Sequence, residues 1–158
     1  MISKIFKDDE FAEMIADHCA DILDYLIASQ TPFGILCDLN EITFEPPLPE
    51  SLSQSFKPLT LFVLSDYTLG GAELNEDTFT LIFEAGFGEQ NFGSIVSVPI
   101  DSVIQVLLED TVIFLNLSAL PQNRKAKPAK TSAGGDASVD RSMQSFLDNP
   151  ENRKFFKK

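Results

Sequence analysis

The chain has 158 residues, of which 44% are apolar, and a net charge of −12. This length is enough for one domain with its own core, and the acidic balance argues against general binding to nucleic acid or anionic membranes. The first nine residues lack the apolar core of a signal peptide, and no apolar run approaches the roughly 18 residues of a membrane span, so we expect a cytoplasmic protein.

Residues 8–29 predict one amphipathic helix. Asp8, Asp9 and Glu10 stand at its start, where carboxylates complement the exposed backbone amides and the helix dipole. The dipeptide Thr31-Pro32 ends it, because a proline disfavours helical backbone in the residue before it. Its apolar side chains recur at steps of three and four residues, at Phe11, Met14, Ile15, Cys19, Ile22, Leu23, Leu26 and Ile27.

The middle of the chain predicts a series of short strands separated by turns. A helix followed by about five to seven strands, without regular strand–helix alternation, indicates a mainly β domain. We therefore expect a small antiparallel barrel or sandwich that the N-terminal helix covers. The predicted strands are residues 33–39, 41–44, 59–65, 78–85, 94–98 and 111–117, with a proline-bounded loop at 46–58, turns at 70–71 and 75–77, a glycine-rich loop at 86–93, and a short helix from Asp101 that carries Val103, Ile104 and Leu107.

The charge and the composition both change after Pro121. Residues 1–121 hold 3 bases and 20 acids, a net charge of −17, whereas residues 122–158 hold 9 bases and 4 acids, a net charge of +5. Residues 122–136 contain no large apolar side chain and cannot bury enough surface to offset the entropy of ordering. We expect a folded domain at 1–121, a flexible linker at 122–141, and a basic-aromatic motif at 142–158.

Apolar residues return near the end of the C-terminal tail, which we expect to be disordered. Met143, Phe146 and Leu147 have helical spacing, and two phenylalanines then stand among four cations in residues 153–158. A frayed, solubilising terminus is the ordinary interpretation, but solvated tails usually avoid bare phenylalanine. The pattern indicates a tethered docking motif.

The sequence contains no recognisable catalytic or metal-binding constellation. His18 is the single histidine, and a metal site or a catalytic triad needs several such partners. We interpret Cys19 and Cys37 as small buried groups in a reducing cytosol, with a disulfide between them as the alternative. Gly86-Phe87-Gly88 has no following Lys-Ser/Thr, so it is not a phosphate loop. We expect no enzyme activity, no metal and no cofactor; an enzyme of unfamiliar type is a distant alternative.

One predicted strand carries a different signal. Phe79, Leu81 and Phe83 point to one side of the strand, and the small Ala85 and then Phe87 follow on that side. Small side chains beside phenylalanine rings can leave an apolar groove for an extended peptide. Packing in the core is the alternative. We favour the core for Phe79 and Leu81, and we leave the choice between core and groove open for Phe83, Ala85 and Phe87.

The order of these segments resembles the stringent starvation protein B (SspB) family of bacterial adaptors, which deliver substrates to the ClpXP protease. The likeness covers about residues 20–117. Its most telling parts are Phe83-Glu84-Ala85-Gly86-Phe87-Gly88 and the following Ser97-Val98-Pro99. Ile35-Leu36-Cys37-Asp38 and the apolar run 59–64 precede them in the same order.

The resemblance implies an SspB-like, Sm-like barrel, a homodimer formed through the N-terminal helix, and a groove for the ssrA-type tag that ribosome rescue adds to stalled chains. Family tags contain acidic residues, so the charge of −17 on residues 1–121 opposes long-range steering. Carried over by position, the groove residues are Leu36, Phe83, Ala85, Phe87, Ile95 and Val96.

The resemblance also gives the tail a partner. Family members end in a short basic-apolar motif that docks on the ClpX unfoldase, and the end of this chain is similar, with phenylalanine in place of the usual aliphatic residues. The implied docking residues are Arg153, Lys154, Phe155, Phe156, Lys157 and Lys158. We expect a proteolysis adaptor without nucleic-acid or membrane partners. The alternative is a peptide- or protein-binding module with a different partner, whose groove its own basic tail covers.

Overall fold

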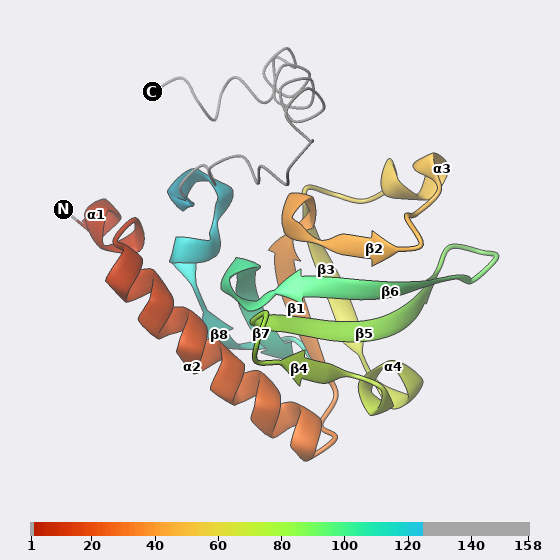
Figure 1. Cartoon of the computed structure of the whole chain (residues 1–158), viewed down its shortest axis with the longest axis horizontal. Helices are drawn as coiled ribbons and strands as arrows, with labels where there is room; N and C mark the ends of the chain where they lie inside the picture. The colour runs from red at the N-terminus through yellow and green to blue at the C-terminus, as the bar shows by residue number, and fades with distance from the viewer. Residues whose placement is uncertain (1, 125–158) are drawn as a thin grey trace, which may run out of the picture. The chain divides into compact units, whose positions relative to one another are not determined.

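Helix α2, Asp9–Ala28, begins and ends within one residue of the predicted bounds. Asp8 caps it, since its Oδ1 accepts hydrogen bonds from the backbone N–H of Glu10 (2.8 Å) and of Phe11 (3.2 Å). A short helix α1, Ile2–Phe6, precedes it in the computed structural model, which describes residues 2–124 (Figure 1). The fully buried side chains of α2 are Ala16, Cys19, Leu23 and Leu26.

The strands form two four-stranded antiparallel sheets. Sheet A has the strand order β3-β1-β7-β8, and sheet B has the order β2-β6-β5-β4. The mainly β, antiparallel prediction is confirmed. The strands of sheet A are β1 Phe33–Asp38, β3 Leu59–Leu64, β7 Val103–Leu108 and β8 Thr111–Leu115, and those of sheet B are β2 Thr43–Glu45, β4 Glu73–Asn75, β5 Thr80–Phe87 and β6 Phe92–Pro99.

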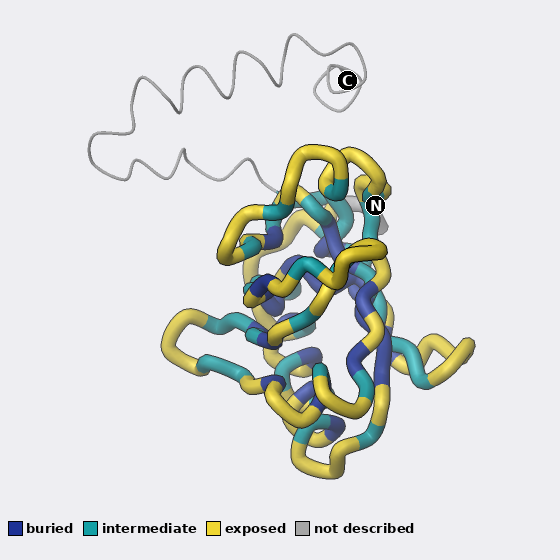
Figure 2. The backbone as a smooth tube through the Cα atoms, turned by 90° about the vertical axis from the view of Figure 1, so that its right-hand side faces the viewer, coloured by how far each residue is buried: buried dark blue, intermediate teal, exposed yellow. Residues whose placement is uncertain are grey.

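The core lies between the inner faces of the two sheets. Alternate residues of β5 and β6 point inward, so that Leu81 pairs with Val98 and Phe83 with Val96, and all four are buried. Across the interior, the ring of Phe62 from sheet A lies 5.9 Å from the ring of Phe83. Figure 2 shows buried backbone concentrated in the centre of the domain and exposed backbone at the connecting loops.

Two different segments cover the two open sides of this pair of sheets. Helix α2 covers the side where β8 and β4 are the edge strands, with the ring of His18 6.2 Å from that of Phe114 in β8 (Figure 1). On the other side β2 and β3 are the edge strands, and the chain connecting them, residues 46–58, carries only the one-turn helix α3, Glu50–Ser53. The side with α2 is therefore covered by a long helix, and the side with the 46–58 loop is covered more thinly.

Three expectations about the β region need correction. The sheets stay open instead of closing into a barrel, because β2 and β3 are joined by a loop and not by a ladder of hydrogen bonds. The expected helix from Asp101 is wrong: a 3₁₀ turn, η2 Ile100–Ser102, leads directly into β7, which pairs with β1. The expected glycine-rich loop 86–93 is also wrong, since Phe87 pairs with Phe92 and only residues 88–91 turn.

The remaining elements are short. Helix α4, Asp66–Gly70, contains the first of the two glycines at 70–71, and β4 follows it where no strand was expected. After η1, Leu39–Glu41, and η3, Leu117–Ala119, the described chain ends at η4, Pro121–Asn123. The expected docking motif and all but the first three residues of the expected linker lie outside the described residues. Within residues 2–124, no helix has the length and apolar character needed to cross a membrane.

Candidate functional site

Four of the six residues predicted to form the groove lie on one face. Phe83, Ala85 and Phe87 alternate along β5, and Val96 in β6 is the partner of Phe83, so all four face the interior from sheet B. Phe83 and Val96 are buried in the core, whereas Ala85 and Phe87 are half-buried near the end of the strand. Phe83 therefore packs as core, and Ala85 and Phe87 remain accessible.

The structure places the other two predicted residues on different faces. Leu36 pairs with Leu61 on the outer face of sheet A, which points away from the core. Ile95 pairs with Glu84 and with Glu45 on the outer face of sheet B, and 44% of its surface is exposed. Leu36 and Ile95 thus do not meet the other four across any one surface.

Five phenylalanine rings meet on the side of the sheets where β2 and β3 are the edges. Edge-to-face contacts, with ring centroids 5.7–6.5 Å apart, connect them into one group, an arrangement that phenylalanine pairs favour. We call this group the Phe cluster; it consists of Phe44, Phe56, Phe62, Phe83 and Phe87.

Sequence reasoning missed three members of the Phe cluster, and Phe62, in the apolar run of β3, is one of them. Phe44 lies in the short strand β2, and Phe56 is the single aromatic residue of the proline-bounded loop, between Ser55 and Lys57. The isolated phenylalanine in a polar loop was the available signal, because such a ring needs an apolar surface to cover it. Phe44, Phe56 and Phe87 are each half-buried, so the cluster reaches the surface of the domain.

The 46–58 loop is fixed at both of its ends. Ser94 Oγ donates a hydrogen bond to the carbonyl oxygen of Pro46 (2.8 Å), and the backbone N–H of Leu39 donates to that of Pro58 (2.9 Å). Between these points the loop is largely exposed. It therefore spans the Phe cluster as a strap attached at two points.

Few side chains of this strap reach inward. Leu48, Leu52 and Phe56 are its half-buried residues, and none of them is fully buried. Leu52 lies against Gly88, where an added Cβ would come 2.6 Å from Leu52 Cδ2 and the backbone has a φ of +74°. Only glycine suits both conditions, so Gly88 allows the strap to approach the end of β5.

A second apolar surface lies on the outer face of sheet A. The pairing register puts alternate residues of its four strands on this face, and each of the six aliphatic side chains is exposed or half-buried. Sequence reasoning missed this surface, although the runs of β3 and β8 lack the polar alternation of a solvated strand. We call it the outer A face; its aliphatic residues are Leu36, Leu61, Val63, Leu107, Val112 and Leu115.

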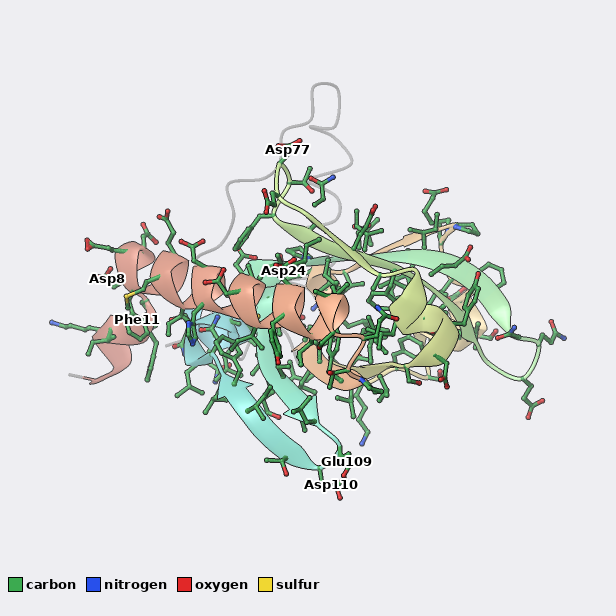
Figure 3. All side chains as sticks on the ribbon, turned by 90° about the horizontal axis from the view of Figure 1, so that it is seen from below. Asp8, Phe11, Asp24, Asp77, Glu109 and Asp110 are labelled. Atoms are coloured by element: carbon green, nitrogen blue, oxygen red, sulfur yellow. The ribbon has the colours of Figure 1, made fainter. Side chains whose placement is uncertain are left out.

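The exposed face of α2 is acidic. Glu13, Asp17, Asp21 and Asp24 are exposed along it, and residues 9–28 contain no lysine or arginine. Figure 3 labels Asp24 on this helix. Elsewhere on the surface, the hydroxyl of Tyr67 donates a hydrogen bond to Glu84 Oε1, and this bond raises the pKa of the phenol. Tyr67 is therefore a neutral donor at physiological pH.

Both cysteines are buried, free thiols. Burial raises the pKa of Cys19 to about 12 and raises the pKa of Cys37 further, with the nearby Asp38 as a second cause. The Sγ of Cys37 lies 3.9 Å from the carbonyl oxygen of Thr60, to which it can donate. Because the thiolate is the nucleophile, neither side chain fits a catalytic role at neutral pH.

We expect both thiols to be inert to a thiol reagent in the folded protein and to react rapidly in urea. The folded pKa of each cysteine is raised, so burial of the neutral thiol stabilises the domain below the unfolded value near 9, and this contribution is lost as the pH rises from 9 toward 12. Reaction with Ellman's reagent and urea melts at pH 7 and pH 10 measure both effects. Rapid labelling of the folded protein at pH 7 would contradict the assigned burial.

Within the described part of the chain, no group of three or more His, Cys, Asp or Glu side chains could hold a metal ion. No family model, curated protein or solved structure matches the chain. The candidate site therefore depends on the geometry of the Phe cluster and its strap.

Proposed function

We propose that this protein is an SspB-like proteolysis adaptor. Its domain would bind a degradation-tag peptide of the ssrA type at the Phe cluster, and residues 153–158 would dock the substrate on the ClpX unfoldase of ClpXP. The segment order that resembles the SspB family supports this proposal, as does the gathering of Phe83, Ala85, Phe87 and Val96 on one face.

The observation that carries the proposal is the thin cover between the edge strands β2 and β3. An extended peptide can add to an edge strand through backbone hydrogen bonds, while pockets beside the strand select its side chains. Among the described strands, β2 pairs with β6 alone and β3 with β1 alone, so each has one unpaired edge. Half-buried rings of Phe44, Phe56 and Phe87 lie between these edges and offer the apolar pockets.

Opening of the 46–58 loop would give the peptide access. The loop holds its place with the three half-buried side chains of Leu48, Leu52 and Phe56, whereas α2 on the opposite side buries four side chains completely. Segments with few buried apolar contacts open at the lowest free-energy cost. A peptide that replaces Phe56 against Phe44 and Phe87 would keep the rings covered.

The tail would act by raising the local concentration of the substrate. A flexible linker of about 20 residues has a root-mean-square span of roughly 22–27 Å, which gives an effective concentration in about the millimolar range. Even a weak contact between residues 153–158 and the unfoldase would then hold the tagged substrate close to it. No chemical step by the adaptor is needed.

We expect a fluorescently labelled ssrA-type peptide to bind the full-length protein with micromolar or tighter affinity in an anisotropy titration. Ala85→Gln should lower the affinity at least tenfold, because the longer side chain fills the space beside Phe87. Since the domain is acidic, affinity for an acidic tag should rise with salt as the repulsion is screened.

The matched control is Ile95→Ser, on the same sheet but on its opposite face. It should leave the affinity unchanged, and thermal melts should show that both variants are folded. Equal loss of binding in both variants would place the site elsewhere, and absence of binding by the wild type would contradict the adaptor proposal.

A further inference from the structure

The outer A face differs from an ordinary solvated sheet surface. Its six aliphatic side chains lie on the same side of neighbouring strands, and Leu61, Val63 and Leu115 expose 52%, 63% and 50% of their surface. An antiparallel sheet with one face in water normally alternates apolar and polar residues, and a contiguous exposed apolar patch marks an interaction site. The patch extends over all four strands, so it spans roughly 15 Å from β3 to β8 at the usual strand spacing.

Gly34 helps to make this face flat. It lies in β1 between Val63 of β3 and Leu107 of β7 and contributes no side chain. The side chains of β3 lean over it, since an added Cβ would lie 3.3 Å from Leu61 Cδ1 and 3.9 Å from Val63 Cγ2. A flat aliphatic sheet surface packs well against another sheet, face to face at about 10 Å.

We propose that the outer A face binds the same face of a second copy of this chain, as a two-fold symmetric homodimer. Gln105 is a polar side chain near the middle of the face, paired with Leu36 on one side and Leu115 on the other. A carboxamide both donates and accepts, so two copies of Gln105 near a two-fold axis can hydrogen-bond to each other. A face of this size can form the apolar core of a standard interface of about 800 Å² per partner.

Charge repulsion opposes a second copy less on the outer A face than on the helix that the family resemblance implies for dimerisation. Each chain carries −12, so two copies approach most easily through a surface with few exposed acids. The acid that strand alternation places on the outer A face is Asp38, at the end of β1, and only 5% of its surface is exposed. Pairing two α2 helices would instead bring Glu13, Asp17, Asp21 and Asp24 of both copies together, on helices that hold no lysine or arginine.

The experiment is analytical ultracentrifugation of the full-length protein over a range of concentrations and salt. The wild type should sediment at twice its chain mass of 17.5 kDa, and the dimer should tighten with salt because screening reduces the repulsion. Val63→Glu and Leu115→Glu, on the two edge strands, should each shift the protein to the mass of one chain. Met14→Glu on α2, at a comparable 57% exposure, should remain dimeric.

Circular dichroism tests whether each variant is folded. The tag-peptide titration tests whether a monomeric variant keeps the proposed peptide site at the Phe cluster. A wild type that is monomeric at every concentration would overturn the proposal, as would a dimer that Met14→Glu dissociates and Val63→Glu does not. If the chain is monomeric and the dye ANS binds only after removal of residues 125–158, the occupant is the basic tail, which also overturns the proposal.

Discussion

Phe62→Ala is expected to lower the free energy of unfolding by about 3–5 kcal/mol, the usual cost of removing a buried ring. Phe62 is 6% exposed and contacts every other ring of the Phe cluster, those of Phe44, Phe56, Phe83 and Phe87. The cavity would open between the two sheets, where little can collapse to fill it. Because a domain of this size is stable by about 5–15 kcal/mol, the variant should lie close to the limit of folding.

The measurement is urea denaturation at fixed protein concentration, followed by circular dichroism. Phe56→Ala is the matched control, since it removes the same ring from a half-buried position in the strap. Its loss of stability should be clearly smaller, because that site can refill with solvent and the strap can shift. Equal losses for the two variants would mean that the 46–58 loop is as much a part of the core as β3.

If the adaptor proposal holds, removal of residues 153–158 is expected to abolish the stimulation of ClpXP degradation of a tagged substrate by this protein. Binding of the isolated tag peptide should not change, since the proposal puts the peptide site in the domain and gives the lost residues only a tethering role. Degradation rates of a tagged fluorescent protein and anisotropy of the labelled peptide measure the two effects separately. Loss of both in parallel would contradict the tether.

Replacement of Phe155 and Phe156 by alanine, with the four cations kept, is the control that separates docking through the rings from attraction by charge.

Removal of residues 153–158 also tests the alternative in which the tail, with its charge of +5, covers a groove on the acidic domain. That alternative predicts tighter peptide binding after truncation, with a difference that shrinks as salt screens the attraction. Unchanged affinity at every salt concentration would exclude it.

The sequence predicted the helix and the strands that are marked by a capping residue, by apolar spacing or by an apolar run. The Asp8 cap and the three- and four-residue apolar spacing gave α2 its bounds, and the apolar runs gave β1, β3, β6 and β8. The segment Val103–Leu108 was misassigned as a helix because a short apolar run has the same appearance in a buried strand and a helix. Its pairing with β1, far away in sequence, decides the outcome.

The candidate site depends on the register in which the strands pair, and the sequence alone does not predict that register. A shift of one residue moves a side chain to the opposite face of a sheet, which is why Ile95 lies away from its chain neighbour Val96. Leu36 points outward from sheet A because its neighbours Ile35 and Cys37 hold the buried inward positions of β1. Phe56 joins the Phe cluster through a loop whose path only the folded domain defines. The outer A face likewise emerges only when four separate strands are placed side by side.

The most direct test of the central claim is a map of the tag peptide on the domain by NMR, from chemical-shift changes in the full-length protein. The account predicts that the largest changes fall on Phe44, Phe56, Ala85 and Phe87 and along the 46–58 loop, with little change on the outer A face. Changes confined to Leu61, Val63 and Leu115, or no changes at a saturating peptide concentration, would contradict a peptide site between β2 and β3.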